Sequence, residues 1–145
     1  MPFVARVVGI VVVVALLAVS ARAAGAQDKG FARAEAVARE TVAGMPRGDR
    51  QDIRVMTATF APGDRTPFHT HRHPVTVYVL EGAFTLELDG RPPVVVRAGQ
   101  AMVEPPNVKM TGYNRSATEP LRVVIFYVSE PDTPFLDPVA TPAGR

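Results

Sequence analysis

Hydrophobic and polar residues alternate over short stretches of the chain between residues 53 and 128. The clearest case is Phe84-Thr-Leu-Glu-Leu-Asp-Gly, where every second residue is apolar and the run ends in Asp89-Gly90, a favoured hairpin turn. Similar β-prone runs, separated by turns rich in Gly, Pro, Asp and Asn, occupy residues 53–60, 75–80, 84–88, 94–97, 101–104 and 121–128. Short strands at this regular spacing predict an all-β sandwich or small barrel.

The N-terminus has a different pattern, because residues 7–19 are entirely apolar. Arg6 precedes this run, and Ala24-Gly-Ala before Gln27 resembles a cleavage site, with Ala21-Arg-Ala as a second candidate. The run is shorter than the roughly 20 residues that a membrane-spanning helix needs. We therefore predict a cleaved signal peptide over 1–26, export to the periplasm or the exterior, and no stable membrane insertion after cleavage.

Two segments flank the predicted barrel, which we place at 51–130. Residues 27–50 are rich in Ala, Arg and Glu, with Phe31, Ala34, Ala38 and Val42 at approximate helical spacing, and are predicted to form a short helix or a linker. Residues 131–145 contain four prolines and are predicted to be an extended C-terminal tail.

Charge and cysteine content narrow the function classes. The formal net charge is +2, but without Arg6 and Arg22 the fourteen remaining basic side chains balance the fourteen acidic ones. No basic face or aromatic-basic interleaving is present, so a nucleic-acid partner is not expected. Because the chain contains no cysteine, it has no disulfide, no thiolate nucleophile and no blue-copper site.

The three histidines of the chain, His69, His71 and His73, stand within five residues of each other. Residues two apart in an extended strand share a face and lie about 6.6 Å apart, so His69 and His71 can approach one metal ion. An isolated H-x-H is a weak signal, since polar residues at a strand end often bind nothing. Whether H-x-H indicates a metal site here therefore depends on the surrounding residues.

Those surroundings resemble the two sequence motifs of the cupin superfamily. In the first motif, a glycine is followed after five residues by H-x-H, then by a glutamate and a second glycine; Gly63, His69, His71 and Gly82 fit this spacing. In the second motif, the positions of glycine, P-x-G, histidine and asparagine hold Gly99, Pro105, Asn107, Met110 and Asn114. The resemblance implies a double-stranded β-helix, or jelly-roll, barrel of the RmlC-like kind.

Two metal-ligand positions depart from the cupin pattern. Cupins usually bind a divalent ion through three histidines and one glutamate, but here Val75 replaces the glutamate and Met110 the last histidine. The predicted ligands are His69, His71 and Met110, with Glu104 or His73 as a fourth. Thioether sulfur favours copper, and zinc, manganese and iron remain alternatives, as does a barrel without metal.

Three functions stay open at this point. The first is an exported metal-binding cupin without an assigned role or substrate, whether or not it is an enzyme. The second is a metal-free barrel that binds a small organic molecule. The third is a structural protein, with a vestigial pocket, that forms oligomers. The resemblance also implies a homodimer, because cupin barrels often pair.

Overall fold

The computed structural model describes residues 30 and 32–140, so the predicted signal peptide lies outside the described residues. These residues form strands and no helix. The strands are β1 (Asp52–Phe60), β2 (His69–Thr70), β3 (Val75–Glu81), β4 (Ala83–Leu88), β5 (Val94–Arg97), β6 (Ala101–Glu104), β7 (Met110–Asn114), β8 (Leu121–Ser129) and β9 (Asp137–Pro138). Accordingly, nothing in this part of the chain is a helix that could cross a membrane.

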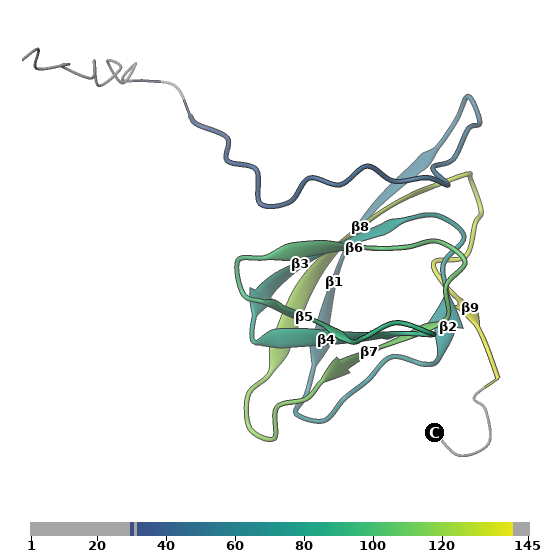
Figure 1. Ribbon diagram of the computed structural model, residues 1–145. Coiled ribbons are helices and arrows are strands. Elements are labelled where there is room, and N and C mark those ends of the chain that lie inside the picture. The colour runs from purple at the N-terminus through teal and green to yellow at the C-terminus, as the bar shows by residue number, and fades with distance from the viewer. Residues whose placement is uncertain (1–29, 31, 141–145) are drawn as a thin grey trace, which may run out of the picture. The chain divides into compact units, whose positions relative to one another are not determined.

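The strands form two antiparallel sheets that face each other (Figure 1). One sheet has the order β1-β8-β3-β6 and the other the order β5-β4-β7-β2-β9. Neighbouring strands are mostly distant in sequence: β1 pairs along its whole length with β8, from Asp52 opposite Ser129 to Phe60 opposite Leu121. This is the predicted all-β double-stranded β-helix.

The core lies between the sheets and follows the alternation of the sequence. On β3, Val75, Val77 and Val79 point inward and are buried, whereas Thr76 and Tyr78 between them are only partly buried. On β4, Phe84, Leu86 and Leu88 face them from the other sheet. Burying an aliphatic or aromatic side chain stabilises the fold by about 1.5–3 kcal/mol, so these inward rows hold the two sheets together.

Each of the six runs predicted from the alternation forms a strand. The segment before the barrel was predicted to be a short helix or a linker, and residues 32–50 contain no helix. Its helical face would have been mostly alanine, which buries too little apolar surface to stabilise an isolated helix. The helical alternative is therefore not seen over residues 32–50, and the linker stays a prediction.

Two of the motif positions have backbone conformations that explain their residue types. Gly82 has a φ of 77°, and a Cβ there would lie 2.5 Å from the carbonyl oxygen of Pro120. Asn107 stands where the cupin pattern has glycine, and its φ is 59°, a left-handed conformation that asparagine tolerates better than most residues. The Asn107 amide donates a 2.7 Å hydrogen bond to the carbonyl of His71, which fixes the backbone next to the predicted ligands.

Candidate functional site

The two predicted histidine ligands lie together inside the barrel. His69 begins β2 and His71 follows its end; their side chains are almost completely buried, with 3% and 1% of their surface exposed. The Nε2 atoms of the two rings are 3.0 Å apart, and the ring planes are nearly perpendicular. The alternation of the H-x-H sequence therefore brings both imidazoles to the same place, as the extended geometry predicts.

Hydrogen bonds to backbone carbonyls determine which nitrogen of each neutral ring carries the proton. His69 Nδ1 lies 2.7 Å from the carbonyl of Pro67, and His71 Nδ1 lies 2.7 Å from the carbonyl of Phe135. Because a carbonyl oxygen only accepts hydrogen bonds, each Nδ1 must carry the proton and donate it. In a neutral ring the Nε2 atom is then an acceptor, so the two close Nε2 atoms present lone pairs to each other.

Glu104 brings a carboxylate to the same place. It lies on β6 directly opposite Val75, the position where the cupin pattern has its glutamate. Glu104 Oε2 is 3.1 Å from His71 Nε2, and Glu104 is 5% exposed. The barrel thus holds a carboxylate one strand away from the expected position.

The buried environment alters the ionisation of the residues around the two imidazoles. Burial lowers the pKa of His69 because the charged ring would lose its hydration, and the neighbouring His71 acts in the same direction. The Pro67 carbonyl and Glu104 oppose this shift. Burial also raises the pKa of the Tyr127 phenol, whose ring lies 6.1 Å from the ring of His71. Burial therefore favours the neutral form of the His69 imidazole, which is the form that binds metal ions.

Met110 occupies a position next to these donors without lining the cavity between them. It is fully buried and lies directly opposite His69 in the pairing of β2 with β7, which places both side chains on the inward face. The cavity beside His69, His71 and Glu104 does not include Met110 in its lining. Its role as a ligand stays a prediction.

His73, the alternative fourth ligand, is not part of this group. Its Nδ1 lies 2.7 Å from the carbonyl of Gly44, and its Nε2 contacts the carboxylate of Glu130. Both ring nitrogens are therefore engaged away from His69 and His71. Pro74, immediately after His73, restricts the backbone there.

A cavity of about 50 Å³ adjoins the three donors. Apart from them its wall is mainly apolar and includes Val75, Phe84 and Phe135. Within residues 30 and 32–140, no three His, Cys, Asp or Glu side chains form a ready metal cage. The contacts instead join His69 to His71 and His71 to Glu104 in a row.

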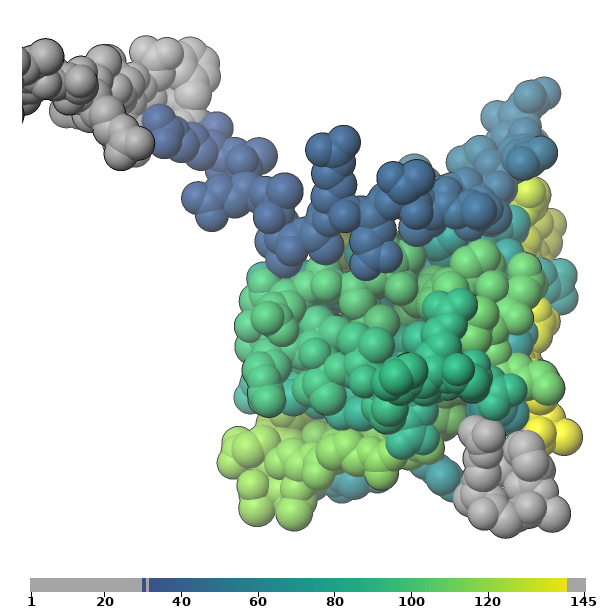
Figure 2. Space-filling view, in the orientation of Figure 1, coloured from purple at the N-terminus to yellow at the C-terminus, as the bar shows by residue number. Residues whose placement is uncertain are grey.

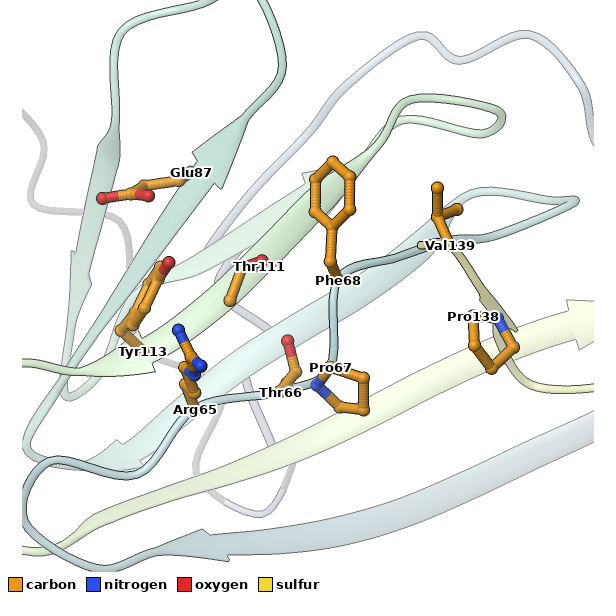
Figure 3. A pocket seen from close by; sticks show the side chains of 9 residues that line it. All are labelled: Arg65, Thr66, Pro67, Phe68, Glu87, Thr111, Tyr113, Pro138 and Val139. Atoms are coloured by element: carbon orange, nitrogen blue, oxygen red, sulfur yellow. The ribbon is translucent and has the colours of Figure 1, made fainter. Parts of the chain in front are cut away.

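A second hollow lies outside the barrel, on the outer face of the five-stranded sheet (Figure 3). It has a volume of about 210 Å³, and its walls include Arg65, Thr111, Tyr113, Glu87 and Val139. Glu87 is paired with Arg115, whose guanidinium also lies 3.9 Å from the centre of the Tyr113 ring. This groove has no histidine in its lining and shares only Thr66 with the lining of the histidine cavity.

Asn114 belongs to the second motif but has a structural role, whereas Phe135 lies outside both motifs. The side-chain amide of Asn114 donates to the carbonyls of Phe60, Ala61 and Glu119, so it holds these backbone segments together. Phe135, in the proline-rich tail, supplies both the acceptor for His71 and part of the cavity wall. The only sequence signal for Phe135 is a large apolar residue among prolines.

Comparison with known proteins agrees with the fold. The Cupin domain family matches residues 56–127, and no curated protein matches the chain. A cupin-like protein from Thermotoga maritima is 21% identical with a TM-score of 0.54, and the match covers 61% of this chain and 65% of that one. The DMSP lyase DddQ from Ruegeria pomeroyi is 18% identical with a TM-score of 0.51, and the match covers 70% and 59% of the two chains.

The polyketide cyclase RemF from Streptomyces resistomycificus is 24% identical with a TM-score of 0.50, and the match covers 63% of each chain. The chain thus spans less than two thirds of each of these three structures. At these identities the likeness concerns the fold, and a lyase and a cyclase on one fold show that the fold does not fix the reaction. By its matched domain, its two facing sheets and these neighbours, the chain belongs to the cupin superfamily.

Proposed function

We propose that this cupin barrel binds one divalent transition-metal ion through His69, His71 and Glu104. The observation that carries the proposal is the meeting of three acceptors, two Nε2 lone pairs and one carboxylate oxygen, at 3.0 and 3.1 Å in a buried place. Buried acceptors at this distance repel each other unless a cation or a proton lies between them.

The spacing of these donors suits a shared ion. Two ligands that each lie about 2.1 Å from one ion and meet it at a right angle are about 3.0 Å apart. The carbonyls of Pro67 and Phe135 hold the two rings by their Nδ1 atoms, which is the usual way in which metal-binding histidines are oriented. A single proton on His71 would also relieve the repulsion, so the experiment must separate the two cases.

The donor set determines which ions fit. Two imidazoles and one carboxylate suit Zn(II), Fe(II) and Mn(II), and Cu(II) has the highest affinity for nitrogen and oxygen ligands among the divalent ions. Met110, buried opposite His69, is the residue that would favour Cu(I). When bound, such an ion supplies a Lewis acid or a redox centre, and the chain's own residues hold it in an apolar enclosure.

The size of the cavity argues against a metal-free organic ligand in the barrel. Sites for drug-sized molecules usually have volumes of about 300–1,000 Å³, whereas the cavity next to the histidines has about 50 Å³. We therefore rank metal binding first and propose no reaction.

Calorimetric titration with Cu(II) and Zn(II) in a non-chelating buffer tests the proposal. We expect one ion per chain, a loss of at least about 100-fold in affinity for His71→Ala, and a similar loss for Glu104→Gln. The matched control is His73→Ala, whose ring is engaged elsewhere and whose loss should leave the affinity unchanged. Equal copper affinity in the wild type and in His71→Ala would place the ion elsewhere or show adventitious binding.

We also propose that the protein is exported, on the basis of the apolar run at 7–19 and the small-residue site before Gln27. Intact-mass analysis of protein from the native host should show a start at Gln27, or at Ala24 if the earlier site is used. Full-length protein that begins with Met1 in the cytoplasm would contradict this.

A further inference from the structure

The C-terminal segment 130–139, here called the strap, crosses the edge of the barrel next to the histidines (Figure 1). It lies beyond residue 127, where the match to the Cupin domain ends. Through β9 it pairs with β2, with Pro138 opposite His69 and Asp137 opposite Thr70. The strap is therefore joined to the strand that carries a predicted ligand.

Polar contacts fasten the strap at several points. The guanidinium of Arg54 donates a 2.7 Å hydrogen bond to the carbonyl of Thr133, and Arg72 forms two hydrogen bonds with the carboxylate of Asp137. The amide of Val139 donates to the carbonyl of Phe68. These anchors lie on both sides of Phe135, so they hold its backbone and ring in place.

Phe135 contacts the site in two ways. Its carbonyl accepts the Nδ1 proton of His71 at 2.7 Å, and its ring centre lies 4.9 Å from that of His71 and 5.6 Å from that of Tyr127. The Phe135 ring is only partly buried and lines the cavity, so the ring forms part of the cavity wall near the protein surface. The same residue thus orients a predicted ligand and forms part of the wall next to it.

We propose that the strap, through Phe135, is a size filter that admits only small inorganic ligands of two or three atoms to the metal bound by His69, His71 and Glu104. The inference rests on the proposed metal binding and names the class of molecule that reaches the ion. A cavity of about 50 Å³ has about a third of the volume of a cavity that takes up benzene, which is about 150 Å³. A five-membered organic ring needs more room than this.

Spectroscopy of the cobalt-loaded protein tests the filter. Elemental analysis first establishes one Co(II) per chain, and the visible spectrum is then titrated with azide, a linear three-atom anion, and with imidazole. In the wild type we expect azide to change the spectrum and imidazole to leave it unchanged. Phe135→Ala should bind imidazole at least about tenfold more tightly than the wild type and azide within about threefold of it.

Phe126→Ala is the matched control, because Phe126 is 44% exposed on the outer face of β8 and its removal leaves the cavity wall intact. Phe135→Leu is a second variant in case the loss of the whole ring in Phe135→Ala loosens the strap. It keeps a large apolar side chain and should bind imidazole with an affinity between those of the wild type and Phe135→Ala. Imidazole binding that is equally tight in the wild type and in Phe135→Ala overturns the filter. So does cobalt-loaded protein in which no variant responds to azide.

A metal-free measurement separates failure of the filter from failure of the metal site. Diethyl pyrocarbonate modifies accessible imidazole, and peptide mass spectrometry assigns the modified histidine. Phe135→Ala should raise the rate at His71 at least about tenfold over the wild type, whereas Phe126→Ala should not change it. An unchanged rate overturns the closure by Phe135. If Phe135→Ala raises the rate at His71 but the wild-type protein binds no Co(II), the metal site and the ligand filter are both wrong. Only the closure of the cavity by Phe135 then remains.

Discussion

The inner and outer faces of β7 show how one strand can line two very different spaces. Met110 and Gly112 lie on the inner face of the strand, and Thr111 and Tyr113 lie on the outer face and line the groove. Inside, the acceptors of His69, His71 and Glu104 face each other in a cavity of about 50 Å³. Outside, the groove has about 210 Å³ and its carboxylate is paired with an arginine.

The difference lies in what neutralises the charge. In the outer groove, Glu87 and Arg115 satisfy each other near solvent, where an ion pair contributes little and its loss costs little. Inside, the Glu104 carboxylate is 5% exposed and no lysine or arginine forms an ion pair with it among the described residues. A change of charge or volume should therefore have a large effect inside and a small effect outside, and the following changes test this contrast.

A second carboxylate at the inner position should have the largest effect. Val75 is fully buried opposite Glu104, so in the metal-free protein Val75→Glu places two carboxyl groups together and should lower the free energy of unfolding by about 3–5 kcal/mol. Mn(II) should restore much of this loss by binding both carboxylates. Urea unfolding with and without Mn(II) measures both effects. Thr76→Glu, the adjacent outward position, should change stability by about 0.5 kcal/mol or less.

Added volume inside should have the next largest effect. A Cβ at Gly112 would lie 2.5 Å from the ring of Phe84, so Gly112→Ala should lower the free energy of unfolding by about 1–3 kcal/mol. Thr111→Val, on the outward side of the same strand, should be nearly neutral. If both variants melt at the wild-type temperature in a thermal scan, the inner face is less tightly packed than the structure indicates.

Acidification of the metal-free protein should have a smaller effect. Burial lowers the pKa of His69 from its ordinary value of 6.5, so the unfolded chain takes up a proton at a higher pH than the folded chain. The stabilising contribution of neutral His69 is full above pH 6.5 and is lost as the pH falls through and below that value. The urea midpoint should decrease between pH 7.5 and 5.5, and the decrease should be smaller in His69→Gln. An identical pH dependence in both proteins would assign the effect to other groups.

The smallest effect is expected in the outer groove. Glu87→Gln removes the charge partner of Arg115 at a half-exposed position and should change the free energy of unfolding by less than about 1 kcal/mol. Its copper affinity should equal that of the wild type, because Glu87 lies on the other side of the sheet from the histidines. A drop in copper affinity comparable to that of Glu104→Gln would show that the two spaces communicate.

The sequence predicts the parts of the fold that depend on local alternation. Phe84-Thr-Leu-Glu-Leu predicts β4, and H-x-H predicts two imidazoles on one side of an extended segment. It does not predict β2, β7 or β9, because these are short or contain glycine or proline, and form only by pairing with other strands.

The rest of the candidate site depends on pairing between distant strands. The sequence leaves Glu104 and His73 as alternatives for the fourth ligand, and our proposal of Glu104 rests on the register that places it opposite Val75. Phe135 was not predicted, because its contact with His71 spans 64 residues and no periodic pattern marks it. Side-chain periodicity shows which face a residue occupies, but not which distant residue lies across from it.

The pairing of β1 with β8 has a consequence for the kinetics of folding. Asp52 pairs with Ser129 and Phe60 with Leu121, so the four-stranded sheet is complete only after segments more than sixty residues apart have met. Chains dominated by such distant pairings fold slowly, typically in milliseconds to seconds. The proposed ligands His69 and Glu104 also come from separate segments, and a bound ion should interact with both mainly after the folding barrier has been crossed. We therefore expect metal to slow unfolding more than it speeds refolding.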